Sequence, residues 1–458
     1  MPEDPHYAPE LGKKSAAEDS VTVVDAVSAP HVAAAEDVDR TPRRLTRNPL
    51  PVQITGQAVS AFGDAFSNVA MPLLVLALTG SVAQMGVAVA VSSIAQLAGS
   101  TFAGGIVDRV DRRRLLIGCD LGQLALGGLI PIVWWLLPAD SWSRWAIWLI
   151  YPIIALSSAL SSVYEVGMRA VLPQIVPPER LVKANAALTT CVEISYGIGP
   201  AIAGLAVAAI GEENSIGVNA LTFGVAAVAW YLIRPARTVG TENDPAAGSP
   251  REQLAGMRFL WQDRLLRVLT VLEAGNTVLA AGAITLLIYY LRHDLGQGSA
   301  AVGLMLTLGS VGAVLAAVST TRMDKGLGVG RAVLLGIAVQ GIALTMSVLA
   351  RSVVSVGALA VVFGFGQILT GILIMSTRQV RTPQRLIGRA TAAALTVVLA
   401  TRFAGGLAST TAAEHAPTVV VLAVLGGLAL LLAAAGCLTI AGRGRPAPAA
   451  GAGAEVSP

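Results

Sequence analysis

Five charged side chains lie inside long apolar stretches of this sequence, and all except the shallow Asp120 are placed deeply enough to carry chemistry that a surface charge cannot. Asp64, Glu193 and Glu273 are carboxylic acids, and Arg402 is a permanent cation. A buried carboxylic acid can hold a proton near neutral pH and release it to water, whereas a buried guanidinium must find a carboxylate, a ligand or water. Whether this chemistry applies depends on what the apolar stretches are.

The apolar stretches have the length and composition of membrane-spanning helices. The 458-residue chain is 54% hydrophobic and 13% charged, with a mean hydropathy of +0.68. Twelve runs are each long enough for a helix to cross ~30 Å of hydrocarbon. They cover approximately residues 51–78, 82–107, 114–137, 145–167, 186–210, 215–233, 266–291, 299–320, 332–350, 353–376, 390–412 and 417–440. The sequence therefore predicts an all-α polytopic membrane protein.

The positive charges predict how these helices are oriented. With the N-terminus placed inside, 28 of the 32 Lys and Arg fall in inner segments. This bias satisfies the positive-inside rule and places both termini in the cytoplasm. The net charge of +4 then reflects topology and indicates no nucleic-acid partner. Few of the basic residues are Lys, and Ala and Gly are abundant, which suggests a GC-rich bacterial genome. We therefore expect the protein in the plasma membrane of a GC-rich bacterium.

The two halves of the chain resemble each other. Gly63-Asp64 recurs as Gly275-Asn276, and "QIVPPERL" at 174–181 recurs as "QVRTPQRL" at 379–386, with a nearly constant offset. We therefore expect two parallel six-helix repeats, an arrangement that suits a transporter with a substrate site between its halves. Asn276 is then the counterpart of Asp64, so the halves differ by one titratable group at the same depth.

These observations divide the chain into five segments. They are a disordered cytoplasmic tail at 1–48, an N-terminal six-helix bundle at 49–233, a cytoplasmic linker at 234–264, a C-terminal six-helix bundle at 265–441 and a second disordered tail at 442–458. Within the linker, Leu254, Met257, Leu260 and Trp261 fall on one helical face. This spacing predicts an amphipathic helix on the inner membrane surface.

A burst of charge, "GGIVDRVDRRR" at 104–114, separates two of the apolar runs. It resembles the loop 2–3 signature of the major facilitator superfamily, whose conserved pattern matches at Gly104, Asp108, Arg109, Arg112 and Arg113. Asp111 stands where the family has its second Gly. The chain from about residue 50 to 440, with stretches such as "VLPQIVPPERLVKANA" and "TPQRLIGRATAA", resembles the branch that holds enterobactin exporters and macrolide-efflux proteins. This resemblance implies the major facilitator fold and secondary transport.

The resemblance also implies a gate at this loop. In the family the loop Asp faces the start of helix 11 across the boundary between the halves, where the helix dipole stabilises an anion. Asp108 is then expected to make this contact in the outward-open state, and Arg112 to pair with Glu165, whose i+4 neighbour is Arg169. The alternative is that the arginines only fix the topology, which suffices for Arg113.

"GPAIAG" at 199–204 resembles the antiporter signature of helix 5. Pro200 favours a kink because it removes a helical hydrogen bond, and Gly199 and Gly204 allow close packing on the facing half. Close packing alone explains the glycines about as well as antiport does.

The resemblance places Asp64, Glu193, Glu273 and Arg402 on helices that line the family's central cavity. Asp64 is the candidate for proton coupling, and its alternative role is to fix helix 1 through hydrogen bonds. Glu193 or Glu273 can partner Arg402 or attract a cationic substrate. Asp120 is expected to be structural, because helix 3 is peripheral in this fold.

Further cavity candidates have amphipathic or adaptable side chains: Tyr164, Tyr196, Phe66, Gln57, Gln367 and Met71. A cavity with so few fixed polar groups suits a large, mostly apolar molecule better than a sugar. The sequence holds no P-loop, no catalytic triad and no metal-ligand spacing, so it predicts neither an enzyme nor a cofactor or metal site.

The sequence leaves three functions open. The first is proton-coupled efflux of a hydrophobic drug, antibiotic or siderophore-like molecule by a monomer in the lipid bilayer. The second is import of a small polar nutrient on the same fold, against which the antiporter-like stretch and the apolar cavity argue. The third is a membrane sensor that has lost transport, against which the retained loop signature and the costly intramembrane charges argue.

Overall fold

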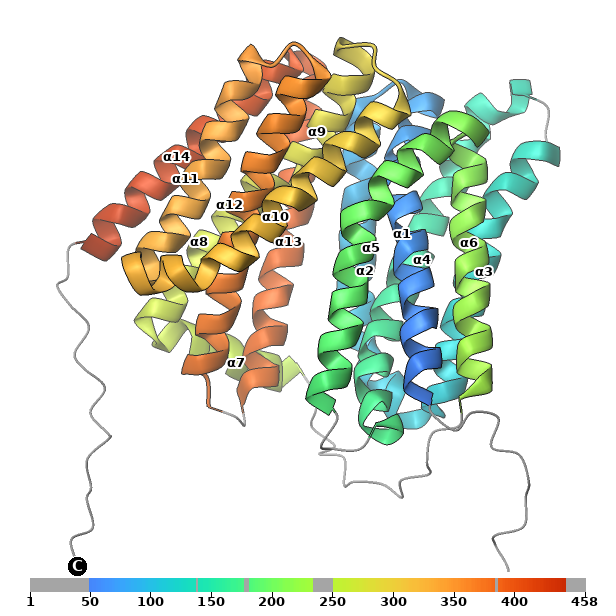
Figure 1. Ribbon diagram of the computed structural model, residues 1–458, viewed down its shortest axis with the longest axis horizontal. Coiled ribbons are helices and arrows are strands. Elements are labelled where there is room, and N and C mark those ends of the chain that lie inside the picture. Colours follow the sequence, from blue (N-terminus) through green and yellow to red (C-terminus); the bar gives the residue numbers. More distant parts are fainter. Residues whose placement is uncertain (1–48, 137–138, 177–180, 234–249, 384–385, 442–458) are drawn as a thin grey trace, which may run out of the picture. The chain divides into compact units, whose positions relative to one another are not determined.

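Helices make up nearly all of the structure, a computed structural model that describes residues 49–136, 139–176, 181–233, 250–383 and 386–441 (Figure 1). In chain order the α-helices are α1 (Pro49–Thr79), α2 (Val82–Arg109), α3 (Arg112–Leu136), α4 (Ala139–Ile175), α5 (Leu181–Ile210), α6 (Glu212–Leu232), α7 (Pro250–Gln262), α8 (Arg264–Ala281), α9 (Ala283–Tyr289), α10 (Ser299–Leu327), α11 (Val329–Met346), α12 (Val353–Arg381), α13 (Ile387–His415) and α14 (Thr418–Ala441). A π-helical turn, η2 (Tyr290–Asp294), and a 3-10 turn, η3 (Ser347–Leu349), extend α9 and α11. The predicted tails at 1–48 and 442–458, and 234–249 of the linker, lie outside the described residues.

Twelve helical segments of the described chain are long and apolar enough to cross a membrane, which confirms the predicted number. Ten of the spans rest on one long α-helix each, and the ninth, Val329–Leu349, combines α11 and η3. The seventh, Arg264–Asp294, combines α8, α9 and η2, with a break at Gly282. The chain is therefore a multi-pass membrane protein.

The helices form two halves with the same packing pattern, the N-half (α1–α6) and the C-half (α8–α14). In the N-half, α1 packs on α5 and α6, α2 on α4, and α3 on α4 and α6. In the C-half, α8 packs on α13 and α14, α10 on α12, and α11 on α12 and α14. These pairs correspond one to one along the chain, so the structure agrees with the two-repeat arrangement predicted from the sequence.

The repeated glycine before Asp64 and Asn276 has a packing role in both halves. A Cβ atom on Gly63 would lie 2.5 Å from Asn219 Oδ1 in α6. A Cβ atom on Gly275 would lie 2.9 Å from Leu432 Cδ2 in α14. Only glycine lets the first helix of each repeat approach the sixth this closely.

The two ends of the bundle differ in charge. Arg109, Arg112, Arg264 and Arg381 are helix-terminal residues at the end where α1 begins and α14 ends, which we call the basic end. The other end, which we call the opposite end, holds the connections at residues 80–81, 211, 295–298, 350–352 and 416–417. The positive-inside rule predicts that the basic end faces the cytoplasm.

Candidate functional site

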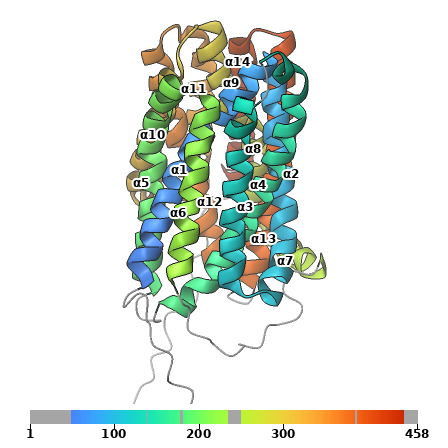
Figure 2. The ribbon, with the colours of Figure 1, turned by 90° about the vertical axis from the view of Figure 1, so that its right-hand side faces the viewer.

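The two halves meet through two helix pairs that are related by the repeat. The fifth helix of the N-half, α5, packs on α10, the second helix of the C-half (Figure 2). Conversely, α2 packs on α13, the fifth helix of the C-half. Each half therefore contributes corresponding helices to the boundary, which is where the family's substrate path lies.

The α5–α10 contact depends on small residues. A Cβ atom on Gly204 would lie 2.7 Å from the carbonyl oxygen of Ser299, and one on Gly303 would lie 2.3 Å from the carbonyl oxygen of Pro200. Toward the basic end, the Ser310 hydroxyl donates to the Tyr196 carbonyl oxygen at 3.1 Å. Pro200 and Gly204 of the antiporter-like stretch thus contact α10 of the other half.

Gly199 of that stretch faces a different neighbour. A Cβ atom on Gly199 would lie 2.4 Å from the Cβ atom of Ala65 in α1. Gly199 therefore permits close packing inside the N-half, whereas Gly204 permits it between the halves. Pro200 is accommodated within a continuous α5.

The α2–α13 contact also lies toward the opposite end. A Cβ atom on Gly86 would overlap the Thr410 side chain, and one on Gly406 would lie 3.3 Å from Val89 Cγ1. At the end of the contact, the Ser81 hydroxyl donates to a carboxylate oxygen of Glu414.

A cross-half ion pair lies at the same end of the bundle. Arg292 in η2 approaches Glu212 in α6 at 3.8 Å. Both side chains are partly exposed, so water screens the pair and it contributes little to closure.

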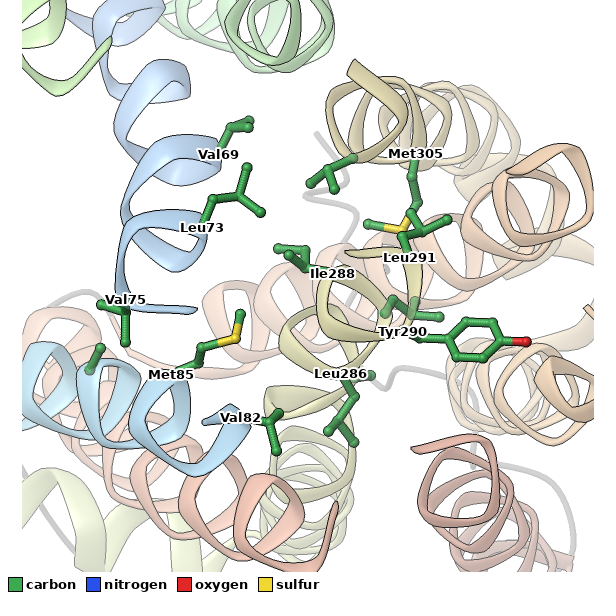
Figure 3. Packing of buried hydrophobic residues seen from close by; sticks show 14 of the residues in the cluster. Val69, Leu73, Val75, Val82, Met85, Leu286, Ile288, Tyr290, Leu291 and Met305 are labelled. Carbon is green, nitrogen blue, oxygen red and sulfur yellow. The ribbon is translucent and has the colours of Figure 1, made fainter. Parts of the chain in front are cut away.

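An apolar layer fills the space between these contacts. Figure 3 shows Val69, Leu73 and Met85 of the N-half on the side of Ile288, while Leu291 lies farther back in the C-half. All five side chains are at most 2% exposed. Together with the polar contacts above, this layer closes the boundary between the halves at the opposite end.

Asp64 lies on α1 without a cation. It is half-buried and interacts with the side-chain amide of Asn219 in α6. Asn219 in turn donates to the Ser67 hydroxyl at 2.6 Å and accepts from the Thr222 hydroxyl at 3.2 Å. No described Lys or Arg forms an ion pair with Asp64.

Glu273 has a different environment from Asp64. Its carboxylate pairs with Arg378 in α12, and the two side chains are 21% and 8% exposed. Arg378 lies beyond the apolar run predicted at 353–376, yet it is within α12 and is buried. Of the two acids that the sequence offered as partners of Arg402, Glu273 is thus paired with Arg378 instead. Asn276, one turn away, is buried.

Glu193 and Arg402 are both exposed, and the structure does not pair them. Arg402 precedes Gly406 by one turn on the face of α13 that meets α2, and forms no ion pair with the described residues. Glu193 lies two turns before Pro200 on the face of α5 that meets α10. Each charge thus lies between the closed contact and the basic end, on a different helix pair.

The loop signature spans the end of α2 and the start of α3. Gly104 and Asp108 lie in the last turns of α2, but their side chains are outside the described part, so the Asp108 gate stays a prediction. Arg109 is exposed. Asp111, which replaces the family's Gly, accepts a hydrogen bond from the Arg114 backbone N–H at 2.9 Å. Asp111 therefore caps α3, which gives a physical reason for the departure from the family pattern.

The arginines of this loop have contacts that differ from those expected. Arg112 donates to the Ala170 carbonyl oxygen at 3.3 Å, while Glu165 pairs with Arg169 on the exposed surface of α4. The structure therefore does not bring Arg112 and Glu165 together.

Arg113 does more than fix the topology. Its guanidinium donates to the carbonyl oxygens of Trp230, at 2.9 Å, and Tyr231, and it lies 5.6 Å from the centre of the Tyr231 ring. Both carbonyls lie in the last turn of α6, where the Trp230 oxygen also accepts from the Ile233 backbone N–H, so Arg113 helps to cap that helix.

The further cavity candidates have different surroundings in the structure. Phe66 belongs to the apolar layer, with Met71 packed against it. Tyr164 accepts from Trp230 Nε1 at 3.0 Å and donates to Gln57 Oε1 at 3.2 Å inside the N-half. Tyr196 and Gln367 are exposed.

Asp120, expected to be a peripheral structural residue, faces the interior of the N-half and is only 1% exposed. The direction in which a helical residue faces depends on its neighbours. The spacing of apolar residues could not predict the direction in which Asp120 faces, because α3 is apolar on most of its surface.

The linker helix α7 docks on the protein. A Cβ atom on Gly256 would lie 2.3 Å from the Arg389 carbonyl oxygen in α13, and Leu260 is fully buried against Ala390. Met257 packs on the same cluster, whereas Trp261 is 48% exposed. The apolar face expected to lie on the membrane surface therefore packs largely against the start of α13.

Known sequences place the chain among transporters. Residues 54–406 match the sequence profile described as Major Facilitator Superfamily. Multidrug efflux pump Tap of Mycobacterium tuberculosis is 27% identical over 244 residues, which cover 52% of this chain and 57% of that protein. Macrolide efflux protein A of Streptococcus pyogenes is 26% identical over 210 residues, or 46% of this chain and 50% of that protein. The chain thus spans little more than half the length of these relatives.

A third relative matches over more of its length. Multidrug efflux pump Tap of Mycolicibacterium fortuitum is 24% identical over 355 residues, covering 75% of this chain and 84% of that protein.

Solved structures share the fold. Nucleoside transporter NupG superposes with a TM-score of 0.68 at 10% identity, over 86% of this chain and 99% of the other. A bacterial homologue of the iron transporter ferroportin, in an inward-facing state, gives a TM-score of 0.61 at 16% identity, over 85% and 98% of the two chains. At these identities the likeness concerns the fold alone.

Proposed function

Because this chain belongs to the Major Facilitator Superfamily, we propose that it is a proton-coupled efflux transporter for a hydrophobic drug, antibiotic or siderophore-like small molecule. Family membership makes it a transporter of small molecules rather than an enzyme. The efflux proteins among its relatives support export as the direction of transport. The chain works by alternating access, in which the boundary between the halves opens at one end at a time.

The conformation described above corresponds to the inward-facing state. The positive-inside bias assigns the basic end, and with it both termini, to the cytoplasm. The apolar layer, the α2–α13 contact and the α5–α10 contact then close the path to the outside. To release its cargo, the protein must separate Leu73 and Met85 from Ile288 and close the basic end.

The observation that supports proton coupling is that Asp64 forms no ion pair with the Lys and Arg side chains that the structure describes. A carboxylic acid that gives up no ion pair on protonation can gain and lose a proton more easily than a paired one. Asp64 takes a proton from outside when the opposite end is open, and releases it to cytoplasmic water when the basic end is open. Substrate moves outward in the same cycle, so the inward flow of protons drives export.

The charges near the boundary support an amphipathic substrate. Arg402 and Glu193 lie exposed between the closed contacts and the basic end, and most of the neighbouring side chains are apolar. A molecule that is largely hydrophobic with one or two polar groups fits such walls.

A cellular experiment tests this proposal. The chain is expressed in a bacterium that lacks its main efflux pumps, and drug susceptibility and dye efflux are measured with and without a protonophore. We expect resistance to at least one hydrophobic compound, and its loss with the protonophore. Asp111→Asn, which removes an exposed carboxylate from α3, serves as the control for Asp64→Asn. An unchanged resistance profile across a broad panel would contradict export and favour import of a nutrient or a sensor role.

A further inference from the structure

Asp120 in α3 is the one described acidic side chain that is fully buried. It is 1% exposed, and its carboxyl oxygen Oδ2 has no hydrogen-bond partner among the described residues. The transport cycle proposed above does not use it. A buried, incompletely bonded carboxyl group in a membrane helix is costly and requires an explanation.

The groups that face Asp120 are acidic or neutral. On α1, Asp64 is close enough to interact with it electrostatically. On α4, the nearest titratable group is Tyr164, whose hydroxyl is already bonded to Trp230 and Gln57. On α3 itself, the neighbour is the thiol of Cys119.

No cation compensates Asp120 among the described side chains. The titratable side chains of α6 are Glu212, Glu213 and Tyr231, which lie at its two ends. Arg112 and Arg113, in the first turn of α3, donate to backbone carbonyl oxygens at the ends of α4 and α6. Among the side chains that the structure describes, Asp64 is therefore the charged group that interacts with Asp120.

These surroundings do not support an ionised Asp120 next to an ionised Asp64. Two carboxylates within electrostatic range of each other in an apolar interior each make the charged form of the other less favourable. The more deeply buried member, which lacks a bond to one oxygen, is the one that holds a proton. Asp120 thus has the environment of a proton-binding group rather than that of a helix anchor.

We propose that Asp120 is a second proton-binding residue that works as a pair with Asp64 behind the substrate path. When Asp64 has released its proton to water at the basic end, the O–H bond of Asp120 breaks and the proton passes through water to the Asp64 carboxylate. The pair then carries one negative charge at a time, located on either acid. This inference rests on the proton coupling proposed above.

The test measures protonation directly. Infrared difference spectra of the purified full chain record the C=O absorption of neutral carboxylic acids as the pH is raised. Wild type, Asp64→Asn, Asp120→Asn and the control Asp111→Asn are compared, after monodispersity and thermal stability are checked. We expect the pH-dependent carboxylic acid band that remains in Asp64→Asn, and is therefore not due to Asp64, to be missing from Asp120→Asn. If Asp64→Asn, which keeps Asp120, shows no such band, or the band does not respond to pH, the proposal is wrong.

Transport by the same variants separates this inference from the proposed function. In proteoliposomes with an imposed pH gradient, Asp120→Asn should lose most of its gradient-driven transport of the compound found in the cellular screen, while exchange at equal pH continues. Wild-type rates in Asp120→Asn would overturn the pairing and leave proton coupling intact. A wild-type protein that ignores the gradient would instead refute the proposed function, and the infrared result would still decide whether Asp120 binds a proton.

Discussion

The N-half and the C-half repeat the same helix packing but surround their acidic residues differently. In the N-half, Asp64 and Asp120 interact electrostatically and form no ion pair with the described residues. In the C-half, Glu273 is paired with Arg378, and Asp263 is paired with Arg381 at 3.3 Å. The position that corresponds to Asp64 in the C-half is Asn276.

This difference assigns different tasks to two similar bundles. An acid with a guanidinium partner keeps its charge, because protonation would strand a buried cation. An acid without such a partner gains from protonation. Arg378 and Arg381 therefore connect α12 to α8 and to the residue that precedes it. The acids of the N-half are available for proton exchange. The two repeats have corresponding positions, and a few side chains at these positions determine which half can exchange protons.

The largest effect should come from breaking the ion pair of the C-half. Glu273→Gln leaves Arg378 buried and unpaired, which we expect to lower the free energy of unfolding by ~3–5 kcal/mol. The double variant Glu273→Gln/Arg378→Gln should recover much of this loss. Thermal unfolding of the purified protein measures both. Proton coupling per folded molecule should survive, so a stable but uncoupled Glu273→Gln would reverse the assignment of tasks.

A second variant tests closure between the halves. Ile288→Ala removes apolar volume from the layer at the opposite end, and Leu/Ile→Ala changes in a core cost roughly 2–5 kcal/mol. We expect an increased population of the outward-open state, seen as faster labelling of a cysteine placed at Ser81. Ile337→Ala, equally buried but inside the C-half, is the matched control. It should lower stability without changing the labelling rate, and equal labelling of both variants would disprove the role of the layer.

A smaller effect separates two neighbouring arginines of the loop. Arg113→Ala removes the cap of α6 and should cost about 1 kcal/mol of stability, since hydrogen bonds to charged groups contribute roughly 1.5–3 kcal/mol and these are partly exposed. Arg114 is exposed, and Arg114→Ala should be nearly neutral. The melting temperatures of the two variants are compared with that of wild type. Equally small decreases in both variants would mean that Arg113 only fixes the topology.

The smallest effect concerns the cross-half ion pair. Glu212→Gln or Arg292→Gln should favour the outward-open state by only ~0.2–1 kcal/mol, because the pair is partly exposed. The charge swap Glu212→Arg/Arg292→Glu should restore wild-type labelling at position 81, whereas each single reversal increases it. If the swap behaves like the sum of the single reversals, the pair has no part in closure.

The fold could be predicted from the sequence because its determinants are local or periodic. Twelve apolar runs fix the helices, and the repeated Gly63 and Gly275 mark corresponding contacts in two halves. The predicted linker helix also forms, as α7. Its docking on α13 could not be foreseen, since an apolar stripe fits a protein groove and a membrane surface equally well.

The environments of the candidate site residues could be predicted only in part. Asp64 and Glu273 were found from their cost inside apolar runs, but their partners depend on the rotation of each helix. Arg378 looks like a loop residue in the sequence because basic residues follow it, yet one further turn of α12 buries it. Asp120 looks peripheral until α3 is rotated against α1 and α4.

The central claim is that Asp64, and not Glu273, couples transport to protons. It is tested most directly in proteoliposomes that contain wild type, Asp64→Asn or Glu273→Gln, with gradient-driven accumulation and equal-pH exchange of one substrate measured on the same preparation. Asp64→Asn should exchange substrate but fail to accumulate it, while folded Glu273→Gln does both. Full accumulation by Asp64→Asn would contradict the account and return Glu273 and Glu193 as the candidates for coupling.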